Sequence, residues 1–456
     1  MSELMKENKM GYMSIGKLLA SMSWPAICSM IIQALYNIVD SIFVSQISED
    51  ALTALTYAFP VQMLIIGFAV GTGVGVNSLV SRRLGAKRYD EAISASNHSM
   101  RLAIFNWLIF AIFGLFFADF YMNVYTETSY ILSEGTAYLK IVTIGSVFIN
   151  VSIIIEKLFQ ATGSMKIPMI SAAIGGISNI ILDPILIFGL FGAPEMGIAG
   201  AAIATIIAQF LSFLFAVVFL IIHNKTFCIS FKHFKYDKQI IKDIYVVALP
   251  GMIMQSIGSI MLFGLNGILA AYSETAVAVL GAYFRLQSFV FMPVFGLNQG
   301  TMPIIGFNFG ARNRERVMKT FKYSFLSALT YMALGFIVFQ LFPAQLLYIF
   351  KPSAHMLEIG IPALKLISIC FIPASFGVMC TTLFQATGHG TLSLFGSLIR
   401  QLIGILPLAW ILIRIGGVTL VWAAFPLAEI LGTLYALFGL RYVMKKEINT
   451  LDKTVE

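Results

Sequence analysis

The chain has 456 residues, of which 58% are hydrophobic and only 11% are charged, and its formal net charge is +8. A soluble protein of this size carries about 25% charged residues, so the composition excludes a soluble globular enzyme. It also excludes intrinsic disorder, which requires low hydrophobicity and a high net charge.

Long unbroken apolar runs predict membrane-spanning helices, because a β-barrel would show short alternating segments instead. In chain order, the runs place twelve helices at 17–44, 51–80, 92–118, 134–158, 168–190, 197–222, 244–270, 276–306, 317–340, 357–382, 391–413 and 418–440. The segment before the first helix lacks the apolar core and cleavage site of a signal peptide. We interpret it as a cytosolic N-terminal segment. The cysteines and histidines show no metal-ligand spacing, so neither a metal site nor a cofactor is predicted.

Basic residues are distributed unequally between the two sets of loops. Most Lys and Arg residues outside the helices fall on the side that holds both termini, whereas the opposite side holds Lys351 and Arg414. The positive-inside rule therefore predicts a multi-pass protein of the cell membrane with both termini in the cytoplasm. The same distribution explains the net charge without a nucleic-acid partner.

The chain is an internal duplication with a constant offset of 225 residues. The pentapeptide Phe-Gln-Ala-Thr-Gly at 159–163 recurs unchanged at 384–388, and Gly71 and Gly75 fall on Gly296 and Gly300. Each half holds six spans, an even number, so the two repeats insert in the same direction and are parallel. The predicted fold is an all-α polytopic membrane protein with two six-helix repeats around a central cavity. We expect lobes at 1–222 and 244–440, a basic cytoplasmic linker at 223–243 and a cytoplasmic tail at 441–456.

A glycine ladder at Gly67, Gly71 and Gly75 lies inside a predicted membrane helix. A dinucleotide-binding glycine motif needs a preceding strand, so the ladder indicates close helix packing instead. No P-loop motif is present, and no catalytic residues are predicted.

Ionisable residues within the spans are costly and are therefore candidate functional residues. Asp40 lies near the outer end of the first span and Asp183 at a similar depth in the fifth. Asn179 precedes Asp183 by four residues and shares its helix face, and Thr205 reaches the same depth in the sixth span. These four side chains predict a site for a cation or proton in the first lobe. Tyr36 and Asn37 share the helix face of Asp40, and Lys140 is the one basic residue that could reach this group.

The remaining intramembrane charges suggest structural roles. Glu156 and Arg101 lie nearer span ends, and Lys140 and Lys365 lie near outer ends, where snorkelling or local pairing is expected. Arg285, Arg400 and Glu429 all fall in the second half and predict an ion-paired polar cluster there.

Proline residues mark two predicted kinks. Pro25 lies in the first span and Pro184 follows Asp183. A proline ring removes one backbone hydrogen bond and clashes with the preceding turn, so we expect a hinge at Pro25.

These features resemble the multidrug and toxic compound extrusion (MATE) family of efflux transporters. The resemblance is carried by Asn179-Ile-Ile-Leu-Asp-Pro184, by Gly197-Ile-Ala-Gly-Ala-Ala-Ile-Ala-Thr205, by the repeated pentapeptide and by the twelve-helix duplication. The acids in the first and fifth spans are similar to those of the DinF-like bacterial branch. The resemblance implies an antiporter that expels organic cations or amphipathic compounds in exchange for H⁺ or Na⁺ by alternating access. It further implies that Asp40, Asn179, Asp183 and Thr205 form the ion-coupling site, with Tyr36, Asn37 and Tyr138 contacting substrate.

Two other functions compete with this interpretation. A flippase for lipid-linked oligosaccharides, from the same superfamily, would use a basic central cavity, for which Arg285 and Arg400 are the candidates. A membrane-embedded enzyme such as an acyltransferase would need a nucleophile–base pair or a metal cluster, and the scattered histidines supply neither. Because two lobes in one chain enclose the predicted cavity, a monomer suffices.

Overall fold

The regular elements of the computed structural model are helices throughout the residues that it describes, 8–223 and 236–451. For residues 37, 38, 40–42, 44, 45, 49 and 52 only the backbone is described. The first half comprises α1 (Lys9–Tyr12), α2 (Ile15–Ser45), α3 (Glu49–Gly85), α4 (Tyr89–Phe116), α5 (Ala118–Tyr125), α6 (Ser129–Gly145), α7 (Val147–Ala161), α8 (Lys166–Phe188), η2 (Leu190–Gly192) and α9 (Gly197–Ile222). The second half comprises α11 (Lys238–Ala270), α12 (Glu274–Gly310), α13 (Arg314–Leu341), α14 (Pro343–Tyr348), α15 (Ala354–Ser368), α16 (Phe371–Thr387), α17 (Gly390–Ser397), η3 (Leu398–Ile405), α18 (Leu406–Leu420), η4 (Val421–Ala423), α19 (Ala424–Lys446) and η5 (Ile448–Thr450).

The long apolar helices of the structure correspond to the spans predicted from the apolar runs. Ten helices in the described chain are long and apolar enough to cross a membrane, and the bent pair α15–α16 adds an eleventh span. The stretch Gly390–Thr450 counts once among the ten, but non-helical backbone at Gly416 and Gly417 separates α19 from the helices before it. That stretch is therefore interrupted, and the predicted all-helical polytopic fold is confirmed.

Several predicted boundaries shift in the structure. The predicted spans 134–158 and 357–382 are each broken, into α6 and α7 and into α15 and α16. Helix α11 begins at Lys238, inside the segment predicted as a linker, of which residues 224–235 lie outside the described chain. Helix α19 continues to Lys446, inside the predicted tail, of which residues 452–456 lie outside the description.

The duplicated sequence motifs form the same local structure in both halves. Ser48 caps α3 by accepting a hydrogen bond from the backbone N–H of Ala51, and Ser273 caps α12 in the same way through Ala276. Such a cap satisfies a backbone donor that the first helical turn leaves without a partner. The pentapeptides end α7 and α16 with Gly163 at φ 89° and Gly388 at φ 93°, a left-handed conformation that glycine adopts without strain.

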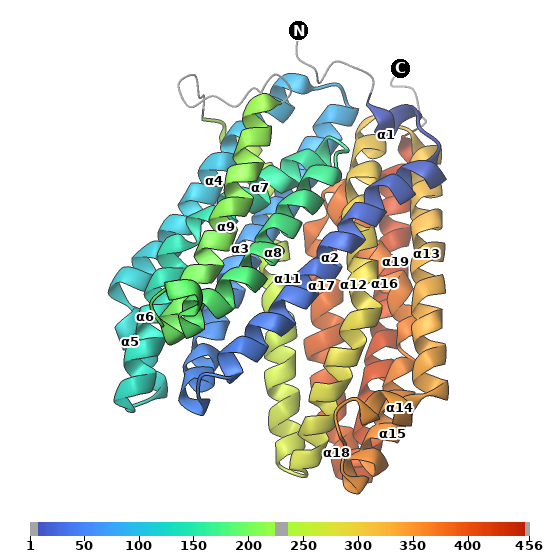
Figure 1. Ribbon diagram of the computed structural model, residues 1–456. Coiled ribbons are helices and arrows are strands. Elements are labelled where there is room, and N and C mark those ends of the chain that lie inside the picture. The colour runs from blue at the N-terminus through green and yellow to red at the C-terminus, as the bar shows by residue number, and fades with distance from the viewer. Residues whose placement is uncertain (1–7, 224–235, 452–456) are drawn as a thin grey trace.

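The helices form two lobes that lie side by side (Figure 1). Helices α3–α9 pack together in the first lobe, and α11–α19 pack together in the second. Helix α2 joins them, because Leu18 and Met22 near its start belong to the core of the second lobe, whereas Ile32 packs against Gly176 of α8. Asn8 and Leu451, the first and last described residues, lie on one face of the molecule, which we call the terminal face.

The predicted glycine ladder brings the two lobes into contact. A Cβ atom added at Gly71 would lie 2.6 Å from the backbone nitrogen of Met252 in α11, and one at Gly75 would lie 2.5 Å from the carbonyl oxygen of Ile244. The equivalent Gly300 in α12 would meet Ser23 of α2 at 2.7 Å. The interpretation of the ladder as a close-packing surface is therefore confirmed, with the partners in opposite lobes. Gly71 and Gly75 lie in the second half of α3, which ends at Gly85.

Each of the two pentapeptide turns accepts a hydrogen bond from a distant part of the chain. The carbonyl of Thr162 accepts a hydrogen bond from Asn8 Nδ2 at 3.1 Å, and the carbonyl of Thr387 accepts one from Arg82 of α3 at 3.5 Å. The short α1 segment beside Asn8 is held in turn by the second lobe, since Arg316 donates to the carbonyl of Met10 at 2.9 Å. The terminal face is thus closed by hydrogen bonds between the lobes, whereas the lobes diverge toward the opposite face (Figure 1).

Candidate functional site

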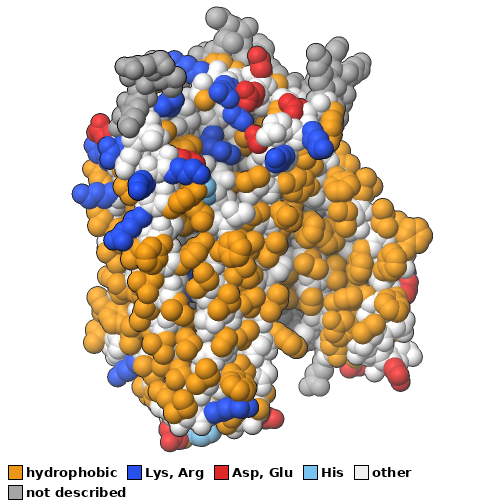
Figure 2. All heavy atoms as spheres, turned by 180° about the vertical axis from the view of Figure 1, so that it is seen from behind, with side chains coloured by type: hydrophobic (Ala, Val, Ile, Leu, Met, Phe, Trp, Pro, Cys, Tyr) orange, Lys and Arg blue, Asp and Glu red, His pale blue; other side chains and the backbone are white. Residues whose placement is uncertain are grey.

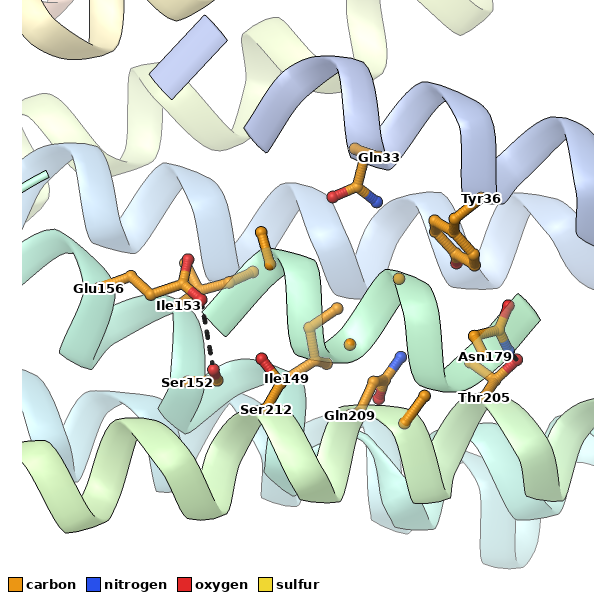
Figure 3. A pocket seen from close by; sticks show the side chains of 14 residues that line it. Gln33, Tyr36, Ile149, Ser152, Ile153, Glu156, Asn179, Thr205, Gln209 and Ser212 are labelled. Carbon is orange, nitrogen blue, oxygen red and sulfur yellow. Dashed lines mark hydrogen bonds between the residues drawn. The ribbon is translucent and has the colours of Figure 1, made fainter. Parts of the chain in front are cut away.

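A polar cavity lies inside the first lobe, among α2, α7, α8 and α9. Its water-accessible volume is about 140 Å³, and Figure 3 shows the side chains that line it. The polar lining side chains are Gln33, Tyr36, Ser152, Glu156, Asn179, Thr205, Gln209 and Ser212. In a membrane, so many hydrogen-bonding groups in one apolar lobe are costly unless they serve a ligand or a permeating ion.

Asn179 connects two of the predicted coupling residues. Its Nδ2 atom lies 3.1 Å from Asp183 Oδ1, one turn further along α8, and 3.4 Å from Thr205 Oγ1 on α9. All three side chains are buried, and Asp183 has no exposed surface. The structure therefore brings these three predicted residues together. Asn179 and Thr205 line the cavity, and the hydrogen bond from Asn179 connects Asp183 to them.

Of the three site residues predicted on α2, the structure describes the side chain of one. Tyr36 lines the cavity, and its Cβ atom approaches Gly176 of α8. The side chains of Asn37 and Asp40 lie outside those that the structure describes. Pro25 lies inside α2, where the helix still packs on the second lobe: Gly296 of α12 approaches Ile27 closely.

Tyr138 is not among the residues that line the cavity. It is 4% exposed and belongs to the apolar core near the face opposite the termini, where its hydroxyl pairs with Gln62. Helix α6, which carries Tyr138, ends at Gly145, before the part of α7 that borders the cavity. The prediction that Tyr138 contacts substrate alongside Tyr36 therefore has no support in the geometry.

Glu156 is a cavity residue whose place the sequence analysis misjudged. We expected snorkelling or local pairing near a span end, but its carboxylate faces the cavity interior (Figure 3). Ser152, one turn earlier on α7, donates a hydrogen bond to Glu156 Oε1 at 3.5 Å. The local signal for this inward face was the spacing of Ser152 and Glu156 by four residues, which places both on one side of α7.

Lys157 follows Glu156 but has a different environment. It lies inside α7, near the end of the predicted span 134–158, and is 9% exposed. Its ammonium group donates to Gln160 at 2.9 Å and to Gln299 of the second lobe at 3.1 Å. These amide oxygens partly replace the water that the ammonium group has lost. Lys157 thus belongs to the contact between the lobes.

Two further acceptors face the same lobe interior. Asn179 Oδ1 and Gln209 Oε1 are buried and accept no hydrogen bond from the described residues. A buried acceptor without a donor costs about 1–3 kcal/mol, which a bound cation, a protonated ligand or a water molecule would offset. Together with Glu156 and Asp183, these oxygens form a surface that favours positive charge.

The predicted second-lobe cluster separates into a pair and a single residue. Arg400 Nη1 lies 3.6 Å from Glu429 Oε1, and the Glu429 side chain is 8% exposed. Arg285 on α12 is exposed, and among the described residues it forms no ion pair with either of them. The three-residue cluster is therefore incorrect, because α12 presents Arg285 away from the neighbourhood of α19. Lys140, for which we expected snorkelling or local pairing, forms an ion pair with Asp119 at 2.7 Å.

Known membrane transport proteins are similar to this chain over most of its length. The MatE family model matches the chain twice, at 25–185 and at 250–411. The multidrug export protein MepA of Staphylococcus haemolyticus is 27% identical over 98% of both chains, and MepA of Staphylococcus aureus strain MSSA476 is 26% identical over 95% of this chain and 96% of its own.

Solved structures agree along the whole chain. An outward-facing multidrug resistance MATE transporter of the MOP superfamily superimposes with a TM-score of 0.89 at 27% identity, covering 99% of both chains. A MOP superfamily transporter from Pyrococcus furiosus, described as having a binding pocket of reverse polarity, gives a TM-score of 0.88 at 27% identity and covers 98% of both chains.

Proposed function

The chain belongs to the MatE family of membrane transporters, and from that premise we propose that it exports organic cations or amphipathic compounds in exchange for H⁺ or Na⁺. It is a transporter and not an enzyme. The observation that carries the antiport mechanism is the buried Asp183 carboxylate, which Asn179 links to a polar cavity that also contains Glu156. The substrates are small molecules, by analogy with the export proteins that the chain is similar to.

The first-lobe cavity is the proposed ion-coupling site. A carboxylate buried in a membrane is costly unless a cation or proton neutralises it. H⁺ or Na⁺ at Asp183, with the oxygens of Asn179 and Thr205 as neighbours, would remove that cost. Asp40 is the second carboxylate of the proposed site, since it follows Tyr36 by four residues on α2.

Competition between the ion and the substrate would drive export. A cationic substrate is attracted to the cavity while its acids are ionised, and it is released when H⁺ or Na⁺ neutralises them. Tyr36 and Asn37 are the proposed substrate contacts, and Glu156 is a third, because it lines the same cavity as Tyr36. Neutralisation also removes a buried charge whose desolvation would oppose rearrangement of the lobes.

We assign the terminal face to the cytoplasm. On the side of the molecule seen in Figure 2, Lys and Arg side chains gather toward that face above a broad hydrophobic band, which supports this orientation under the positive-inside rule. The close contacts at Gly71 and Gly75 hold α3 against α11 of the second lobe, so we infer that the lobes are closed toward the terminal face. The described conformation then corresponds to a state that releases substrate outward, and a cytoplasm-facing state requires these contacts to separate. One chain supplies both lobes, so the proposed unit is a monomer in the cell membrane.

The flippase alternative requires a basic cavity for a pyrophosphate group. Arg400, one of its two candidate residues, is held by Glu429, which lowers its positive potential toward an anionic ligand. The acids of the first-lobe cavity attract the opposite charge. The geometry thus favours a cationic substrate.

Efflux from proteoliposomes under separately imposed pH and sodium gradients tests the proposal. Asp183→Asn should abolish ion-driven efflux while the protein still folds, because the neutral amide keeps the shape of the side chain. Glu156→Gln should weaken export of cationic substrates more than export of neutral ones. The matched control is Asp119→Asn, which removes an exposed carboxylate that pairs with Lys140 outside the cavity. Efflux with wild-type rate and ion dependence in the Asp183 variant would contradict the proposed coupling.

A further inference from the structure

The second lobe holds an ion pair between a partly buried arginine and a buried glutamate, and the arginine lies in an unusual helical segment. Arg400 lies on η3, eight residues of π-helix between α17 and α18, and its partner Glu429 lies on α19. π-Helices are rare, and where they occur they frequently mark functional positions. The Arg400 side chain runs along Gly432 of α19, where an added Cβ would lie 3.3 Å from Arg400 Cβ and 3.5 Å from its Cδ. Gly432 therefore leaves the space through which Arg400 reaches Glu429.

This pair occupies the counterpart of the first-lobe cavity. The offset of 225 residues maps Ser152 to Gly377, Glu156 to Thr381 and Gly175 to Arg400. Each member of the first set lines the first-lobe cavity, and each member of the second set lines a small cavity beside the ion pair. The corresponding elements are α7 and α16, α8 and α17–η3, and α9 and α19.

The two cavities differ in what fills them. In the first lobe the position of Arg400 is taken by Gly175, and the water-accessible volume is about 140 Å³. In the second lobe that volume is about 20 Å³. The carboxylate also comes from a different helix. In the first lobe it belongs to Glu156 on α7, whereas in the second it belongs to Glu429 on α19 and faces the guanidinium of Arg400. A positive group that belongs to the chain thus stands where the first lobe has open space beside a carboxylate.

We propose that Arg400 is a built-in cation, so that the second-lobe cavity is a cation site whose permanent occupant is the guanidinium of the chain itself. The second lobe then takes no cation from solution, and ion coupling belongs to the first lobe alone. The ligand class that fits the second-lobe site, once Arg400 is shortened, is a small guanidinium or ammonium ion. The assignment rests on the second-lobe geometry, and it draws on the proposed function only for the comparison with the first lobe.

Rescue of a truncated variant by a soluble guanidinium tests this assignment. In Arg400→Ala, Glu429 loses its counter-charge and a void opens, so the unfolding midpoint of the purified full-length protein should fall. Methylguanidinium should then raise the midpoint saturably, by a larger shift than in the wild-type protein, because it binds the folded state. Arg400→Ala/Glu429→Gln should lose this gain, since no acid remains to hold the ion. Sodium chloride at equal ionic strength is the control for screening.

The comparison with the wild-type protein separates the two lobes. If the first-lobe proposal fails, methylguanidinium should leave the unfolding midpoint of the wild-type protein unchanged. It should still raise the midpoint of the Arg400→Ala variant. A folded Arg400→Ala variant that gains no shift over wild type overturns the assignment, and so does an equal gain in the double variant.

The reciprocal substitution keeps the assignment testable if Arg400→Ala cannot be purified. A Cβ at Gly175 meets only ordinary contacts, the nearest at 3.5 Å from Ser212, so a longer side chain has room to enter the cavity. Gly175→Arg should fold and pair with Glu156, and Gly175→Arg/Glu156→Gln should then have a lower unfolding midpoint than either single variant. Gly175→Met, with similar bulk and no charge, should show no such dependence on Glu156. If Glu156→Gln changes the unfolding midpoint by the same amount in the Gly175→Arg and Gly175→Met backgrounds, the two cavities are not equivalent and the assignment is overturned.

Discussion

Replacing Gly75 by alanine should push the closed lobes apart. The new Cβ would lie 2.5 Å from the carbonyl oxygen of Ile244 and 2.8 Å from the Cβ of Ala248. The first of these atoms belongs to the backbone of α11 and cannot rotate away. The two helices must retreat by roughly 1 Å, and overpacking of this kind costs about 1–3 kcal/mol.

This cost applies only while the terminal face is closed, because the contact joins opposite lobes. The equilibrium should therefore shift toward the state that is open at the terminal face by a factor of roughly 5 to 150. Gly267→Ala is the matched control, since nothing lies within 4 Å of a Cβ at that position in α11. The control should gain the helix propensity of alanine, about 1 kcal/mol, without moving the lobes.

Spin labels at two exposed positions of the terminal face, Arg88 in the first lobe and Arg314 in the second, would report the distance between the lobes. The Gly75→Ala variant in proteoliposomes should populate a longer distance than wild type, and Gly267→Ala should not. Substrate efflux should slow in the first variant, because the outward-open state is less populated. A wild-type distance distribution together with raised thermal stability in Gly75→Ala would refute the reasoning.

Three further predictions concern the first lobe and the orientation. Asp40→Asn should abolish ion-driven efflux in liposomes without loss of membrane insertion, and wild-type pH and sodium dependence would remove Asp40 from the coupling site. Pro25→Ala should slow transport while expression stays near normal, because the restored backbone hydrogen bond stiffens α2 where it leaves the second lobe; unchanged turnover would make the proline a passive kink. A cysteine at exposed Lys238 should resist an impermeant thiol reagent in intact cells while one at exposed Arg414 reacts, and the reverse result would invert the topology.

Much of the fold follows from local sequence signals. Apolar runs of about 20 residues must form helices in a membrane, because backbone groups there find no water. The constant offset predicted a repeated architecture, and its motifs do form repeated caps and turns, as at Ser48 and Ser273 or at Gly163 and Gly388. The spacing of Asn179 and Asp183 placed both on one helix face, and Asn179 does donate to Asp183.

The tertiary structure alone decided which charges share a cavity. Glu156 and Lys157 are neighbours in the chain, yet one faces the first-lobe cavity and the other bonds to Gln299 across the lobe contact. Arg285 and Arg400 looked equivalent as basic residues within spans, but only Arg400 reaches Glu429. The direction of a side chain depends on how its helix is rotated, broken and packed, and those variables are set by residues far away in the chain. The length of an apolar run is a local property, so the sequence predicts which segments span the membrane. The direction in which one charged side chain points depends on how the helices of a lobe pack together.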